Sequence, residues 1–93
     1  MFARVSAYEG DAEDLREGFE RVTDPPREIE GFERAYFLIG DSGKAMSITL
    51  WESRDALEAS VDAANRLRED ATQPSGAAIP SVDSYEVAIA VDH

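Results

Sequence analysis

The sequence predicts an α+β fold in which two helices lie against one face of a four-stranded antiparallel sheet. Four segments alternate between apolar and polar side chains, two others place apolar residues at helical spacing, and glycine or proline separates most of them. The elements follow the order β-α-β-β-α-β, which is the order of a ferredoxin-like sandwich. The chain contains no linker and no repeat, so we expect a single domain over residues 1–93.

The first half of this order begins with a strand over residues 2–9, which Gly10 ends. The following helix starts at Asp11, whose carboxylate can cap the first turn, and stops before Pro25, because a proline pushes the preceding residue out of the helical region. Its apolar side chains recur at helical spacing: Leu15, Phe19 and Val22. Residues 27–31 then form a connecting loop.

A hairpin comes next. Its strands are residues 32–39 and 45–51, and both are rich in residues that favour strands. The turn between them, residues 40–44, contains two glycines that can supply the positive φ a tight hairpin loop requires.

The last part of the chain predicts a second helix, a loop and a strand. Ser53 is placed to cap the helix, which runs to about Glu69 along a stripe that contains Leu57, Val61, Ala64 and Arg68. Residues 70–80 hold proline, glycine, serine and alanine without a period, which is typical of a loop. Residues 81–91 alternate again and form the final strand.

Two helices can cover only one face of such a sheet. The aliphatic sets favour the covered face: Val5, Phe37, Ile39, Met46, Ile48, Leu50, Val87, Ile89 and Val91. A more aromatic set is left for the open face: Phe2, Tyr8, Tyr36, Leu38, Ser47, Thr49, Trp51, Ala88 and Ala90. A patch of this kind is too apolar to face water, so we expect a homodimer with its two sheets face to face.

Charge and composition exclude several classes of function. With 20 acidic and 9 basic side chains, the chain carries a formal net charge of -11, which disfavours nucleic acids and anionic membranes as partners. It has no cysteine, and its only histidine is His93, so we expect no metal site. No apolar run is long enough to span a membrane and the first residues do not form a signal peptide, which favours the cytoplasm.

A family resemblance rests on the stretch from Ser47 to Ser60, which reads SITLWESRDALEAS. Together with Gly31-Phe32 and Tyr36-Phe37, this stretch resembles the antibiotic biosynthesis monooxygenase family of the dimeric α+β barrel superfamily. The resemblance implies a ferredoxin-like protomer in a face-to-face dimer. It also implies that the protein needs no cofactor, since some members oxidise aromatic polyketides or quinols without metal or flavin, while others degrade haem.

The chain departs from this family at one important position. Many relatives carry a histidine on the second helix where this chain has Ser60, so the usual imidazole is missing. The haem-degrading branch has an Asn-Trp-His set, of which only Trp51 is matched, because the single asparagine, Asn65, lies late in the helix. Haem is therefore not an expected ligand.

The candidate site is a small-molecule pocket, placed between helices and sheet or at the dimer seam. Tyr36 is the candidate catalytic residue, as a hydrogen-bond donor to a developing oxyanion, and Trp51 is the stacking wall. Tyr8, Ser60 and Arg34 are further substrate-binding candidates, with Arg34 pairing an anionic ligand. Each side chain also has a structural explanation, in core or interface packing, a buried hydrogen bond or an ion pair.

Two classes of function therefore stay open. The first is a cofactor-independent monooxygenase-like protein acting on a small aromatic or enolisable molecule. The second is a non-catalytic dimeric module of the same fold that binds a small ligand or only packs its sheets. The missing imidazole favours the second class in mechanism, whereas the family resemblance favours the first.

Overall fold

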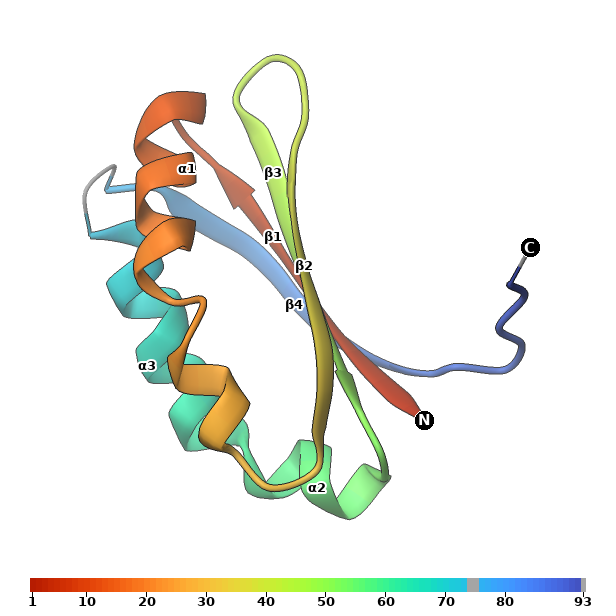
Figure 1. Ribbon diagram of the computed structural model, residues 1–93. Helices are drawn as coiled ribbons and strands as arrows, with labels where there is room; N and C mark the ends of the chain where they lie inside the picture. The colour runs from red at the N-terminus through yellow and green to blue at the C-terminus, as the bar shows by residue number, and fades with distance from the viewer. Residues whose placement is uncertain (74–75, 93) are drawn as a thin grey trace.

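The computed structural model describes residues 1–73 and 76–92. It contains one antiparallel four-stranded sheet with helices against one of its faces (Figure 1). The strands lie in the order β2-β3-β1-β4 and have these bounds: β1 Phe2–Glu9, β2 Phe32–Ile39, β3 Lys44–Trp51 and β4 Ala78–Glu86. The helices are α1 Ala12–Arg21, the short 3-10 helix η1 Pro25–Glu28, α2 Arg54–Ala59 and α3 Val61–Thr72. The predicted α+β, ferredoxin-like fold is confirmed.

The start of each predicted helix is confirmed by its cap. The Asp11 carboxylate accepts hydrogen bonds from the backbone N–H groups of Glu13 and Asp14, and Ser53 Oγ accepts one from Ala56 N–H. Each cap satisfies N–H groups that the first helical turn leaves without a partner. The amphipathic pattern of α1 is also confirmed, since Leu15 and Phe19 are buried.

The second helix is not continuous, as the sequence predicts, but breaks into α2 and α3 at Ser60. The Ser60 hydroxyl donates to the carbonyl oxygen of Leu57 at 2.7 Å, and the same carbonyl accepts a hydrogen bond from Arg4. These bonds end α2 one turn after Leu57. Helical periodicity misses such a break, because it depends on a distant arginine.

Two connections also differ from their predicted form. Residues 25–28, which overlap the start of the predicted connecting loop 27–31, form the 3-10 helix η1. Residues 70–72 extend α3 and residues 78–80 begin β4, so the predicted loop 70–80 is shorter than expected. Pro74 and Ser75, which belong to that loop, lie outside the described residues.

The register of the strands shows which side chains share a face, because directly paired residues point to the same side of a sheet. Ile48 pairs with Tyr36 on β2 and with Val5 on β1, so these side chains form one row. The two neighbouring rows are Leu38-Met46-Ala7 and Arg34-Leu50-Ala3. Tyr36 and Leu38 are 44% and 45% exposed, so the three rows belong to the face without helices.

The opposite face lies beneath the helices. Its side chains differ in part from those predicted to be covered. Phe37 and Ile39 pack in the core and Tyr36 and Leu38 are open, as predicted. The assignment is wrong for the aliphatic residues of the first and third strands, which lie on the open face: Val5, Met46, Ile48 and Leu50. It is also wrong for the polar and aromatic set, which lies beneath the helices: Phe2, Tyr8, Ser47, Thr49 and Trp51.

The error has a physical cause. Alternation divides each strand into two sets of side chains, but pairing register decides which sets of neighbouring strands join, and a shift of one residue exchanges the faces. The more hydrophobic set is normally the covered one. Here Arg4, Ser6 and Ser47 lie beneath the helices instead, and they are 5%, 2% and 6% exposed.

The last strand begins and ends earlier in the chain than the predicted range of residues 81–91. β4 ends at Glu86, which pairs with Phe2 at the start of β1, and Val87 N–H then donates to the carbonyl oxygen of Met1. The chain after Glu86 leaves the sheet (Figure 1). Ile89 and Val91 lie in this last segment and are 82% and 86% exposed rather than part of the covered face.

The core between sheet and helices depends on one close approach. Phe19 of α1 stacks edge-on against Tyr8 and lies 5.0 Å from the ring centre of Phe37. Beside it, Gly18 brings α1 against the backbone of α3 at Ala71, since a Cβ on Gly18 would lie 1.7 Å from the Ala71 carbonyl oxygen.

None of the helices in the described part of the chain is long and apolar enough to cross a membrane.

Candidate functional site

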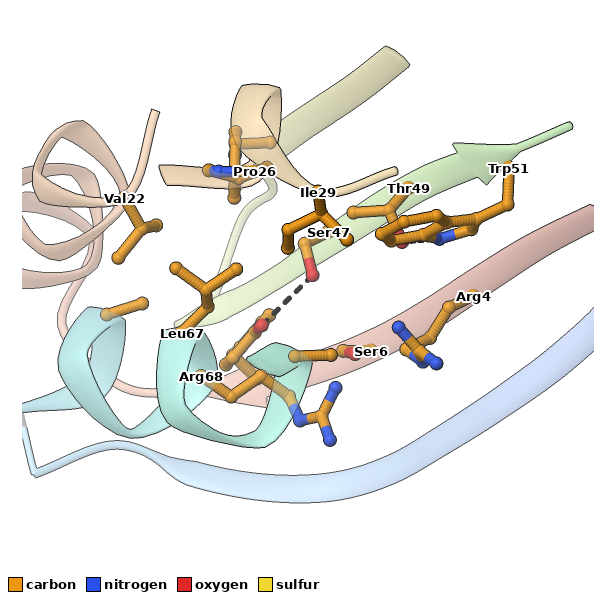
Figure 2. A pocket seen from close by; sticks show the side chains of 14 residues that line it. Arg4, Ser6, Val22, Pro26, Ile29, Ser47, Thr49, Trp51, Leu67 and Arg68 are labelled. Atoms are coloured by element: carbon orange, nitrogen blue, oxygen red, sulfur yellow. Dashed lines mark hydrogen bonds between the residues drawn. The ribbon is translucent and has the colours of Figure 1, made fainter. Parts of the chain in front are cut away.

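A cavity of about 40 Å³ lies between the sheet and the helices (Figure 2). Side chains of β1 and β3 form its floor: Arg4, Ser6, Tyr8, Ser47, Thr49 and Trp51. Pro26 and Ile29 close one side, and Leu67 and Arg68 of α3 form the roof. Much of this lining is apolar, and the polar groups are concentrated on the floor, which is the usual composition of a small-ligand site.

A phenol and a serine hydroxyl form a pair on the floor of the cavity. Tyr8 Oη and Ser47 Oγ lie 2.9 Å apart, and either hydroxyl can be the donor. Tyr8 is 2% exposed, and burial raises the pKa of its phenol because an ionised phenolate would lose its hydration. The phenol therefore stays protonated at neutral pH and can donate one hydrogen bond to a ligand in place of Ser47.

Trp51 forms the wall at the far end of the floor. Its indole Nε1–H donates to Thr49 Oγ1 at 3.0 Å, and Phe32 packs edge-on against the indole at 5.5 Å. These contacts fix the plane of the ring, whose face is 5.8 Å from the guanidinium carbon of Arg4. Trp51, a predicted site residue, thus lines this cavity.

Arg4 is buried beside Trp51 and holds Ser60 in place. Its Nη1–H donates to Ser60 Oγ at 3.1 Å and its Nη2–H donates to the Leu57 carbonyl oxygen at 2.7 Å. Burial lowers the pKa of Arg4, and the positive charge of Arg68 lowers it further, yet an arginine remains charged at neutral pH. Ser60 is thus a support for Arg4 rather than part of the lining.

Tyr36 and Arg34, two of the predicted site residues, contact one another but do not border this cavity. Arg34 Nη1–H donates to Tyr36 Oη at 2.9 Å, and this hydrogen bond raises the pKa of Arg34. Both side chains are on the open face of the sheet, opposite the cavity. The predicted pocket that combines Tyr36 with Trp51, Tyr8 and Ser60 is therefore wrong, because the sheet separates Tyr36 from the other three.

The sequence analysis does not identify Arg4 and Arg68 as site residues, although both line the cavity. A signal for each is nevertheless present in the sequence. Arg4 alternates in phase with Ser6 and Tyr8, and Arg68 continues the apolar stripe that contains Ala64. A charged residue is unusual at a position whose side chain points into the core. Such a residue occurs here both on a strand and on the helix that covers it, and this pattern indicates a binding site rather than a packed core.

The described residues contain no group of three or more histidine, cysteine, aspartate or glutamate side chains that could hold a metal ion. Within those same ranges, the residues lining the cavity include neither a carboxylate nor an imidazole. The chemical groups on offer are thus two guanidiniums, a phenol, hydroxyls and an indole. This set can bind and polarise a planar ligand and can stabilise negative charge on it.

Comparison with known protein families shows which family the chain resembles. The model of the family described as antibiotic biosynthesis monooxygenase matches residues 1–68, which contain β1 to β3, η1 and most of the cavity lining. No curated protein sequence is similar enough to count as a match.

Several solved structures share the fold over nearly the whole chain. SnoaB, a cofactor-independent oxygenase from Streptomyces nogalater, has a TM-score of 0.74 at 12% identity, with 99% of this chain and 97% of that chain covered. The ActVA-Orf6 monooxygenase of Streptomyces coelicolor, in complex with nanaomycin D, has a TM-score of 0.75 at 20% identity, with 99% and 91% covered. A variant of MhuD with two manganese protoporphyrin IX molecules per active site has a TM-score of 0.71 at 22% identity, with both chains fully covered.

Proposed function

The chain belongs to the antibiotic biosynthesis monooxygenase family, and we propose that it binds a small aromatic or enolisable molecule in the cavity beneath its helices and oxidises it with dioxygen without a cofactor. The observation that carries this proposal is a hydrogen-bonding floor enclosed by apolar walls. Trp51 offers an aromatic face, and the Tyr8 hydroxyl lies inside the same cavity. We further propose that residues 1–93 act as one domain.

The chemistry required of such a site is limited. A methylene next to a carbonyl loses a proton to solvent, and the resulting carbanion adds dioxygen to form a peroxide anion, which takes a proton back from solvent to give a hydroperoxide. Loss of water from the hydroperoxide then leaves a new carbonyl, so that R₂CH₂ and O₂ give R₂C=O and H₂O. The protein has to orient the ring and stabilise the oxyanion form of the substrate, and we assign the hydrogen-bond donor role to Tyr8 rather than to Tyr36.

The ligand must enlarge the cavity, because about 40 Å³ is far below the roughly 300 Å³ at which small-molecule sites begin. Ile29, Leu67 and Arg68 are partly exposed and form the wall nearest to solvent. These side chains can move without exposing the deep core around Leu15 and Phe19. A single-ring ligand is therefore a better first probe than a fused polycyclic one.

A ligand titration tests this function through the only tryptophan in the chain. Aromatic ketones, phenols and quinols, with nanaomycin D included, are titrated against Trp51 fluorescence, and oxygen consumption is then followed for those that bind. Tyr8→Phe removes the proposed donor, so the rate of oxygen uptake is expected to fall about 10- to 100-fold while binding of the ring changes little. Tyr85→Phe, which alters an exposed tyrosine on the open face, is the matched control.

The same titration separates the two candidate functions. A non-catalytic binding module is favoured by one specific observation, since the described lining residues provide no general base. Binding without oxygen uptake would support that alternative. A complete lack of response in Trp51 fluorescence across the panel would contradict both.

We also propose that the protein is a homodimer whose protomers meet through their open sheet faces. Four large side chains on this face are at least one third exposed: Tyr36, Leu38, Met46 and Tyr85. Strand register makes them part of one continuous apolar surface with Val5, Ile48 and Leu50. A second copy covers such a surface with closed two-fold symmetry, and the exposed Ile89 and Val91 can extend the contact.

Leu38→Glu is expected to convert the dimer into a monomer, because it would bury a carboxylate without a partner within the apolar surface of the interface. Val61→Glu is the matched control, since Val61 is equally exposed at 44% but lies on α3, away from this face. Multi-angle light scattering at micromolar concentration measures both. A wild-type monomer, or a Leu38→Glu dimer, would contradict the proposed interface.

A further inference from the structure

Two positive charges face the cavity from opposite sides. Arg4 comes from β1 and Arg68 from α3, and Figure 2 shows both among the side chains that line the cavity. The chain as a whole carries a formal net charge of -11, so a local excess of positive charge runs against its composition. Across residues 1–73 and 76–92, Arg4 and Arg68 form no ion pair and no carboxylate lines the cavity.

The hydrogen bonds of Arg4 do not neutralise its charge. A guanidinium has five N–H donors, and the two observed bonds go to a hydroxyl and a peptide carbonyl, which are both uncharged. The carbonyl belongs to the last turn of α2, where the helix dipole offers at most about half a negative charge. An arginine that is 5% exposed is costly unless an anion pairs with it.

Arg68 adds to this imbalance. Its side chain donates to Asn65 Oδ1, again a neutral acceptor, and it is only partly buried on the solvent side of the cavity. The other titratable group that lines the cavity is Tyr8, which burial keeps as a neutral phenol. The described site therefore has two cations and no anion of its own.

We propose that the cavity binds its ligand as an oxyanion on a planar ring, paired with Arg4 from below and Arg68 from the solvent side. This inference rests on the proposed function and names its ligand class: a phenolate or enolate, or else an aromatic carboxylate. Trp51 packs against the ring and the guanidiniums hold the charged oxygen. The role also accounts for Ser60, which holds a cation beside the ligand where an imidazole base would otherwise lie.

Three probes with the same ring test the ligand class. 4-Nitrophenol, 4-nitrobenzoate and 4-nitroanisole differ in whether they carry a phenolate, a carboxylate or a neutral ether, and each nitro ring quenches tryptophan fluorescence. At a pH where the first two are ionised, at least one of them is expected to bind about 10- to 100-fold more tightly than the ether. The better of the two anions tells a phenolate or enolate ligand from a carboxylate.

A second readout measures the charge directly. The phenolate of 4-nitrophenol absorbs visible light and the phenol does not, so a pH titration gives the pKa of the bound probe. That pKa is expected to be at least one unit lower in the complex than in water, because the two cations favour the ionised form. If Arg4 only packed against the ring, the pKa of the bound probe would be the same as in water.

Charge-removing variants assign the effect to residues. Arg4→Gln and Arg68→Gln are each expected to reduce the preference for the anionic probe, by about 10-fold or more and by about 3- to 10-fold, respectively. Arg66→Gln is the matched control, since it removes the same charge from an exposed position of α3 that does not line the cavity. Circular dichroism checks folding, and Arg68→Gln keeps the test valid if Arg4→Gln unfolds.

The outcomes that overturn the inference differ from those that overturn the proposed function. Equal binding of the three probes would contradict the oxyanion ligand while leaving an aromatic site in place. A preference for anions that survives in both Arg4→Gln and Arg68→Gln would contradict the residue assignment. Absence of quenching by all three probes, the neutral ether included, would contradict the proposed function itself.

Discussion

Trp51→Ala is expected to lower the free energy of unfolding by about 3–5 kcal/mol. Trp51 is 2% exposed, packs against Phe32 and Arg4, and donates a hydrogen bond to Thr49. Alanine removes the contacts and leaves a cavity beside a buried cation. A domain of 93 residues is stable by only about 5–14 kcal/mol, so this is a large share of the total.

Urea unfolding followed by far-ultraviolet circular dichroism measures this loss, since Trp51→Ala has no tryptophan signal. Trp51→Phe is the matched control and should lose about 1–2 kcal/mol, because it keeps an aromatic ring but cannot donate to Thr49. Because Trp51 forms the aromatic wall of the cavity, the Ala variant should also lose binding of the neutral ring probe, measured by equilibrium dialysis. An unchanged midpoint for Trp51→Ala would show that the indole is not packed as described.

Gly18→Ala is expected to destabilise the protein by about 1–3 kcal/mol, although the same change within a helix usually stabilises by about 1 kcal/mol. The reversal of sign follows from the contact between helices. A Cβ at Gly18 would lie 1.7 Å from the carbonyl oxygen and 2.7 Å from the carbonyl carbon of Ala71, and these are backbone atoms that cannot rotate away. The two helices would have to separate, which loosens the packing around Phe19.

Glu20→Ala serves as the control, since Glu20 is exposed on the same helix and its replacement should change stability by less than about 0.5 kcal/mol. Thermal unfolding of the two variants beside the wild type decides the sign. A higher melting temperature for Gly18→Ala would mean that helix propensity outweighs the contact and that α1 and α3 are further apart at this point.

Much of the local structure follows from the sequence. The cap residues Asp11 and Ser53 define where two helices start, and the confirmed caps show that short-range hydrogen bonds are enough to place them. The hairpin is equally local, because the turn needs positive φ at Ser42 and Gly43, at +60° and +77°, within a stretch of glycine, aspartate and serine. Element order and fold class follow from these local signals.

The candidate site could be predicted only in part. Trp51 and Tyr8 were identifiable as large aromatic residues on strands, and both lie in the cavity. Tyr36 has the same local pattern yet points to the opposite face, since it pairs with Ile48 rather than with an inward residue of β3. One residue of register thus separates a cavity side chain from a surface one.

Local signals in the sequence predict the order β-α-β-β-α-β, the helix starts and the hairpin, because all of these depend on residues close together in the chain. Strand register and helix packing instead set which side chains form the open and covered faces, where the second helix breaks, and that Arg4 and Arg68 line the same cavity. Arg4 acts on Leu57 and Ser60 from more than 50 residues away. Periodicity within a segment carries no information about such contacts, which arise from strand register and helix packing.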